Sequence, residues 1–89
     1  MLNADEKYLE ELFYEEKIIE YNQLGLMLCW TKIDGEEIPL KHMEDSHIKN
    51  CIKMLSNLRT NYSRKAWIYI FNDVLLKRRH EKLNKLLYK

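Results

Sequence analysis

Proline and glycine are scarce in this chain of 89 residues, which contains one proline and two glycines. With no Pro/Gly-rich linker, no internal repeat and no low-complexity stretch, we expect a single small domain over residues 1–89. No apolar run approaches the roughly 20 residues that a helix needs to cross a bilayer. We therefore expect that the protein does not associate with a membrane.

Cysteine is equally scarce, and the two cysteines do not predict a disulfide. Cys29 lies in an apolar run and Cys51 lies on an expected helix face. The chain does not open with the pattern of a secretory signal peptide. Two buried, reduced thiols in a cytoplasmic protein are therefore expected.

The sequence also lacks the motifs of common active sites: a Gly-rich phosphate loop, a nucleophile elbow and HExxH. His47 and Cys51 are four residues apart, which places two possible zinc ligands on one helix face, but structural zinc sites usually have two tight ligand pairs. Acidic residues near His47 suggest an acid/base pair, yet Asp34 is needed for its own turn. We expect no enzymatic activity, no metal and no cofactor.

Charge is abundant and unevenly distributed, although the formal net charge is only +1. Residues 1–22 hold seven acidic and two basic residues, a net charge of minus five. Residues 63–89 hold eight basic and two acidic residues, a net charge of plus six. Such asymmetry predicts that the two ends attract each other, within one chain or between copies, or that one end meets an oppositely charged partner.

Four segments are expected from the hydrophobic pattern, and together they predict a mainly helical α+β domain with three helices packed around a short β-hairpin. The segments are a helix over 3–23 capped by Asn3, a hairpin over 27–40, a helix over 42–57 and a helix over 64–87. Asp34-Gly35 is a tight-turn signal, and Pro39 requires the second strand to be short or at an edge. The alternatives are a continuation of the first helix to Leu28, a later start of the second helix capped by Asp45 or Ser46, and a strand over 67–71.

Apolar stripes at helical spacing predict which face of each helix is buried. In the first helix the stripe is Tyr8, Leu9, Leu12, Phe13 and Ile19. Later stripes consist of Ile48, Cys51, Ile52, Leu55 and Leu58 in the second helix, and of Trp67, Phe71, Val74 and Leu75 in the third. Leu76, Leu83 and Leu87 follow, and the last two turns of the third helix are expected to project beyond the core.

Two charged surfaces are candidate binding sites. The acidic first helix, with Glu10, Glu11, Glu15 and Glu16, can imitate nucleic acid in front of a basic protein cleft. The third helix carries basic residues near aromatic rings, suited to phosphates and bases: Arg64, Lys65, Lys77, Arg78, Arg79 and Lys82. Nucleic-acid or nucleotide binding by these residues is the alternative function, unless the charges are simply solvated or face the acidic helix.

Residues 30–50 contain the pattern W-T-x-x-D-G-x-x-I-P-L-x-x-M-x-x-x-H-I-x-N. This segment resembles one in small uncharacterised proteins of bacteriophages and prophages. The resemblance implies a phage accessory protein, a class that includes inhibitors of host defence such as anti-CRISPR proteins, in the host cytoplasm. It implies no catalytic residue. His47 and Asn50 either hydrogen-bond back to the hairpin or, with Trp30, contact a partner.

We therefore expect a non-enzymatic protein that acts by binding and inhibits a host or anti-phage defence protein. Ten aromatic residues are more than one thin core usually hides. Their surplus predicts self-association, with a dimer as the expected oligomer.

Overall fold

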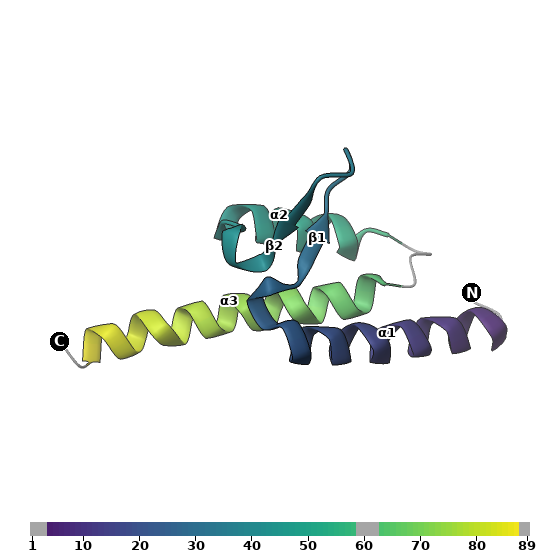
Figure 1. The fold of residues 1–89 in the computed structure, drawn as a ribbon, viewed down its shortest axis with the longest axis horizontal. Coiled ribbons are helices and arrows are strands. Elements are labelled where there is room, and N and C mark those ends of the chain that lie inside the picture. Colours follow the sequence, from purple (N-terminus) through teal and green to yellow (C-terminus); the bar gives the residue numbers. More distant parts are fainter. Residues whose placement is uncertain (1–3, 59–62, 88–89) are drawn as a thin grey trace.

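The computed structural model describes residues 4–58 and 63–87 of the chain. Within them the chain forms three α-helices, α1 (Ala4–Leu24), α2 (Asp45–Ser56) and α3 (Arg64–Leu87), and a two-stranded antiparallel sheet of β1 (Cys29–Thr31) and β2 (Glu37–Pro39). Short 3₁₀ turns, η1 (Gly25–Met27) and η2 (Leu40–His42), join the hairpin to its neighbours. The predicted mainly helical α+β fold is confirmed (Figure 1).

The hairpin reverses at the predicted Asp-Gly turn. The backbone N–H of Gly35 donates to the Lys32 carbonyl over 2.9 Å, and Asp34 Oδ1 accepts from the Glu36 N–H over 2.9 Å. Gly35 has a φ of +88°, a conformation that costs glycine little and other residues much. The strands pair in the register Cys29–Pro39, Trp30–Ile38 and Thr31–Glu37.

Two predicted boundaries differ from the structure. The second helix begins at Asp45 and not at His42, because Leu40–His42 closes a separate 3₁₀ turn and Glu44 is extended. The first helix ends at Leu24, where Gly25 takes a φ of +56° and the chain turns into η1. The later start is thus the alternative that is found, whereas α1 stops before Leu28 and residues 67–71 are helical. The predicted cap Asn3 and residues 59–62 lie outside the described residues.

The core lies on one face of α3, under α2 and the hairpin. Ile70, Phe71 and Val74 of α3 are at most 1% exposed. The Trp30 ring of β1 stands edge-on to Trp67 and to Phe71, with ring centroids 4.9 and 5.2 Å apart. An isolated two-stranded hairpin is marginal in water, so this aromatic contact with α3 is what holds the hairpin in place.

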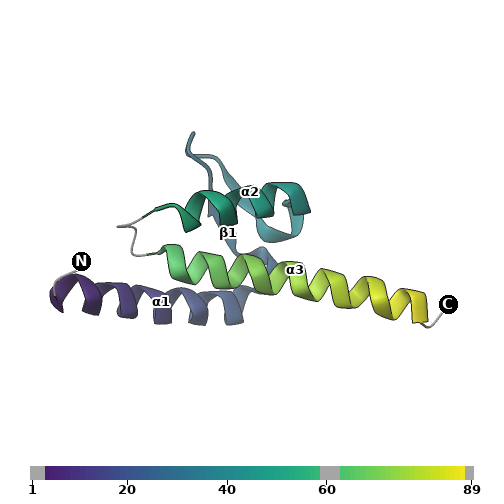
Figure 2. The ribbon, with the colours of Figure 1, turned by 180° about the vertical axis from the view of Figure 1, so that it is seen from behind.

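A second face of α3 is covered by α1, which lies beside it and runs in the same direction (Figures 1 and 2). Three contacts at increasing residue numbers define this packing. Lys65 forms an ion pair with Glu10 over 3.2 Å, the Tyr69 ring meets Tyr14 at 6.5 Å, and Asp73 accepts a 2.6 Å hydrogen bond from the Tyr21 hydroxyl. One of the three contacts, the Glu10–Lys65 ion pair, joins the acidic first helix to the basic third helix within the chain.

The prediction for the buried face of α1 was wrong. Glu10 and Tyr21 are buried, and Ile18 packs against the core. The members of the predicted stripe are instead 39–64% exposed: Tyr8, Leu9, Leu12, Phe13 and Ile19. The physical reason is that α1 meets α3 through tyrosine rings and an ion pair, which a search for aliphatic spacing overlooks.

The stripes of the other two helices are largely confirmed. Ile48, Cys51 and Leu55 of α2 are buried, whereas Leu58 is 37% exposed. Trp67, Phe71 and Val74 of α3 are buried and Leu75 packs against the core. The side chains of residues 79–87 are all exposed, so the end of α3 projects beyond the core as predicted.

The Tyr21–Asp73 hydrogen bond gives the fold a pH-dependent contribution. Hydrogen bonding from Tyr21, with Lys77 nearby, lowers the pKa of Asp73 below its ordinary value. Because the folded-state pKa is the lower one, this stability is complete above the unfolded pKa and is lost as the pH falls through the folded pKa.

We predict that Tyr21→Phe lowers the free energy of unfolding by about 1 kcal/mol at neutral pH, the usual worth of such a bond. The loss should shrink as the pH falls through the lowered pKa of Asp73, where the carboxylate of the folded chain takes up a proton. Urea denaturation at neutral pH and at a pH below that pKa measures it, with Tyr69→Phe as the control, because Tyr69 is 49% exposed and its ring contact with Tyr14 does not need the hydroxyl. A loss that is equal at both pH values contradicts the account.

Candidate functional site

A mostly apolar groove of about 420 Å³ lies between the hairpin and α2. The hairpin contributes Trp30, Lys32, Ile33 and Asp34, and α2 contributes His47, Asn50, Cys51 and Met54. Three predicted binding residues, Trp30, His47 and Asn50, therefore line one hollow although they come from two elements.

Local structure fixes the walls of the groove. Spacings of three and four residues place His47, Asn50, Cys51 and Met54 on one face of α2. On the other wall, Trp30 is held by its contacts with Trp67 and Phe71, so its ring is a rigid surface. The turn carries Ile33 outward, where it is 97% exposed. Burying this side chain in a contact would remove apolar area from water, which favours association.

Sequence reasoning missed Ile33 and Met54, which supply much of the apolar surface of the groove. Signals for both exist in the sequence. Ile33 immediately precedes the Asp-Gly turn, and Met54 lies seven residues after His47, which is two helical turns along the same face.

The polar groups that line the groove are the Cys51 thiol, the His47 imidazole, the Asn50 amide and two charged side chains of the hairpin. Burial raises the pKa of the Cys51 thiol, which keeps it protonated and a poor nucleophile. Among residues 4–58 and 63–87, no group of three or more His, Cys, Asp or Glu side chains is placed to hold a metal ion. In the same residues, no hydrogen bond joins the His47 or Asn50 side chain to the hairpin, so the first of the two roles left open for these residues is not found.

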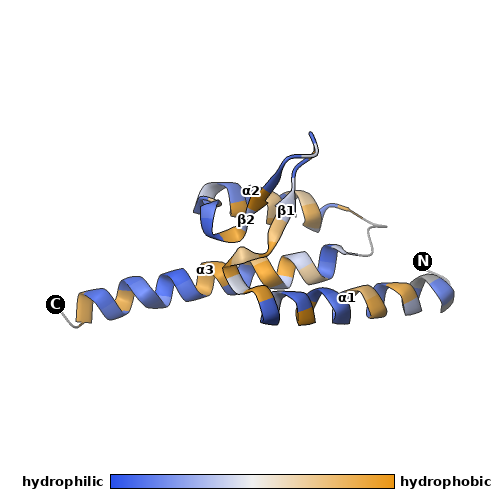
Figure 3. Cartoon of the chain, viewed as in Figure 1, coloured by the Kyte–Doolittle hydropathy of each residue, from blue (hydrophilic) through white to orange (hydrophobic). Residues whose placement is uncertain are grey.

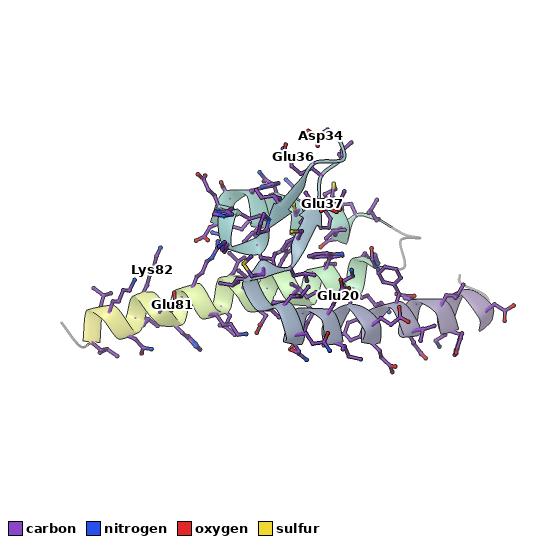
Figure 4. The ribbon with its side chains drawn as sticks, viewed as in Figure 1. Glu20, Asp34, Glu36, Glu37, Glu81 and Lys82 are labelled. Carbon is purple, nitrogen blue, oxygen red and sulfur yellow. The ribbon has the colours of Figure 1, made fainter. Side chains whose placement is uncertain are left out.

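The acidic side chains at the hairpin tip belong to the turn. Asp34 and Glu36 lie at the far end of the hairpin, away from α3 (Figure 4). Lys32 Nζ lies 3.2 Å from Glu36 Oε2 and 3.9 Å from Asp34 Oδ2, and the hydrogen bond to Glu36 raises the pKa of Lys32. The rim of the groove is therefore charged and internally paired around an apolar centre.

The four glutamates proposed for α1 do not form one surface. Glu11, Glu15 and Glu16 are exposed, but Glu10 is only 9% exposed and is paired with Lys65. This corrects the prediction for Glu10, which belongs to the α1–α3 contact and is not available to a partner.

The six basic candidates of α3 are also separated. At the start of α3, Arg64 donates a hydrogen bond to the Leu58 carbonyl and Lys65 pairs with Glu10. Lys77 pairs with Asp73 of its own helix over 2.9 Å. These three side chains have partners within the chain, and none of them lines the hollow that Arg78, Arg79 and Lys82 share.

Arg78, Arg79 and Lys82 line a second hollow of about 400 Å³ with Lys49 of α2. Arg78 donates to Asp45 Oδ1 over 2.7 Å and to the Leu40 carbonyl over 3.1 Å, and its hydrogen bond lowers the pKa of Asp45. Arg78 therefore ties α3 to the start of α2. Lys82 lies on the part of α3 beyond α1 (Figure 4), and Lys49 was not predicted because sequence gives no sign that α2 meets α3 there.

No protein-family model matches the chain, and no curated protein or solved structure is significantly similar to it. Within the described ranges no helix has the length and apolar character that crossing a membrane requires. The class that the fold defines is a small, mainly helical α+β domain with an apolar groove.

Proposed function

We propose that this protein is a non-enzymatic, phage-type accessory protein that binds another protein through the groove between the hairpin and α2. The groove supports this proposal because it combines a rigid aromatic wall, Trp30, with an isoleucine, Ile33, that is 97% exposed. Apolar side chains that become desolvated at the centre of a contact supply most of its binding energy.

The partner in this proposal presents an apolar side chain that enters the groove. His47 and Asn50 lie at the side of the groove and can direct the orientation of the partner through hydrogen bonds. The charged rim of Lys32 and Asp34 excludes water from the centre without adding much affinity.

The biological outcome that we propose is inhibition of a host or anti-phage defence protein, in the cytoplasm of the host cell. The resemblance of residues 30–50 to segments of phage and prophage proteins supports it, and the same residues build most of the hairpin and supply six of the eight residues that line the groove. Occupying a surface of the partner is sufficient for inhibition and needs no chemical step. We also propose that the protein acts as a homodimer, since many apolar side chains of α1 and α3 remain exposed.

We predict that Ile33→Asp weakens partner binding by more than about tenfold, because hot-spot side chains are worth about 2 kcal/mol or more. The partner is first captured from host lysate with the wild-type chain, and its Kd is then measured with purified proteins. Leu86→Asp is the matched control, because Leu86 is 69% exposed on α3 and does not line the groove. Equal binding by the two variants contradicts the groove as the binding site.

A second candidate function is binding of nucleic acid at the hollow lined by Lys49, Arg79 and Lys82. The supporting observation is that α2 adds a fourth cation to the three basic side chains of α3 at this hollow. Side chains from two elements can follow consecutive phosphates better than one helix can.

For this candidate we predict binding that weakens steeply with salt and falls by about tenfold or more in the variant Lys49→Glu with Lys82→Glu. The control, Lys7→Glu with Lys53→Glu, makes the same change in net charge at other exposed positions. Fluorescence titration with a labelled oligonucleotide measures both. A flat salt response, or equal losses in the two double variants, counts against a nucleic-acid site here.

A further inference from the structure

The face of α3 that α1 covers continues past the end of α1. Lys65, Tyr69 and Asp73 meet α1, and the same helix face is carried on by Leu76, His80, Leu83 and Leu87 at spacings of three and four residues. Leu76, Leu83 and Leu87 are 51%, 49% and 76% exposed. We call these four residues the tail stripe. Figure 3 shows apolar positions interrupting the hydrophilic surface of this part of α3.

The tail stripe is uncovered because α1 is too short to reach it. Near the end of α1, the Tyr21 ring lies 5.3 Å from Lys77 Nζ, and α1 stops at Leu24. Past the end of α1, no other helix of the described residues lies beside the face of α3 that α1 covers (Figures 1 and 2).

An unmatched apolar stripe is also present on the outer face of α1. Tyr8, Leu12 and Ile19 are 64%, 39% and 55% exposed. Each lies two residues before a residue that contacts α3, namely Glu10, Tyr14 and Tyr21. Two residues correspond to about 200° around a helix, so the outer stripe points away from α3.

We infer that the outer stripe of α1 packs antiparallel on the tail stripe of a second copy of this chain. The spacings of the two stripes agree. In the outer stripe, Leu12 follows Tyr8 by four residues and Ile19 follows Leu12 by seven. In the tail stripe, counted backwards, Leu83 lies four residues before Leu87 and Leu76 lies seven residues before Leu83. Antiparallel packing therefore pairs Tyr8 with Leu87, Leu12 with Leu83, and Ile19 with Leu76. Each stripe is about 16 Å long at 1.5 Å per residue.

Charge favours pairing of the tail stripe with α1 of a second copy over pairing of two tails or of two α1 helices. Residues 76–87 contain five basic residues and one acidic residue, a net charge of plus four, whereas residues 4–24 have a net charge of minus five. The same register sets Glu16 opposite Arg79 and Glu15 opposite His80. Pairing two tails or two α1 helices instead brings like charges together, which disfavours both arrangements.

A two-fold axis makes the contact twice, so the assembly closes as a dimer and leaves no unmatched copy of either stripe. This inference rests on the proposed self-association and names its interface. The groove remains free, because α2 and the hairpin lie on the other side of α3 from α1 (Figure 1). A monomer that binds its partner through the groove would overturn the dimer and leave the partner-binding function intact.

The first test removes one apolar contact of the interface. Leu83→Asn should raise the Kd of the dimer by at least about tenfold, because the side chain is buried at two symmetric places. Sedimentation velocity of the full chain over a range of micromolar concentrations measures it. Ile33→Asn is the control, since Ile33 is exposed at the far hairpin tip and should leave the Kd unchanged. A wild-type chain that stays monomeric, or a dimer indifferent to Leu83→Asn, overturns the inference.

The second test examines the register. Glu16→Arg and Arg79→Glu should each weaken the dimer by about fivefold or more, because each creates like-charge contacts at two places. The double variant restores opposite charges and should return to within about twofold of the wild-type Kd. Lys85→Glu, which makes the same charge change on the opposite side of the tail, should have little effect. Single variants that weaken the dimer without rescue in the double variant overturn this register.

Discussion

The third helix is the element on which every other part of the structure depends, because it must bury two faces and no single neighbour can cover both. Phe71 and Ile70 are fully buried. On one face, Trp67 and Phe71 hold the Trp30 ring and, with it, a hairpin too small to be stable alone. On the other face, Lys65, Tyr69 and Asp73 bind α1. Neither the hairpin nor α1 contacts enough of the rest of the chain to be fixed without α3.

This dependence separates the two surfaces that we propose to be functional. The groove uses the hairpin and α2, which pack on one face of α3, whereas the dimer interface uses α1 and the tail of α3 on the other. Binding at one surface does not obstruct the other, and a dimer presents two grooves at a fixed separation. Two linked sites can bind a repetitive or dimeric partner more tightly than one site can.

Much of this architecture follows from the sequence, because the relevant signals are local. The span of α3 follows from its unbroken register of apolar residues, and the hairpin turn follows from Asp34-Gly35. The candidate residues Trp30, His47 and Asn50 share one groove, which their positions on a strand and on one helix face made predictable in part.

The sequence does not reveal features that arise from contacts between distant segments. The inner face of α1 is formed by Glu10, Tyr14 and Tyr21, which read as a polar face until Lys65 and Asp73 are placed opposite them. For the same reason, the apolar spacing of the outer stripe wrongly predicts that this stripe is the buried face of α1. The sequence alone suggests that Arg78 is a free cation, whereas in the fold it is bonded to Asp45 and to the Leu40 carbonyl. Lys49 lies at the basic hollow only because α2 packs against α3.

Hydrogen–deuterium exchange of the intact chain at low and high protein concentration tests most directly whether the first half of α3 is covered within the chain and its tail by a second copy. The account predicts that amides of residues 66–74 are protected at both concentrations, whereas amides of residues 79–87 become more protected at the higher concentration. Exchange of residues 79–87 that does not change with concentration, or exchange of residues 66–74 as fast as that of the tail, would contradict it.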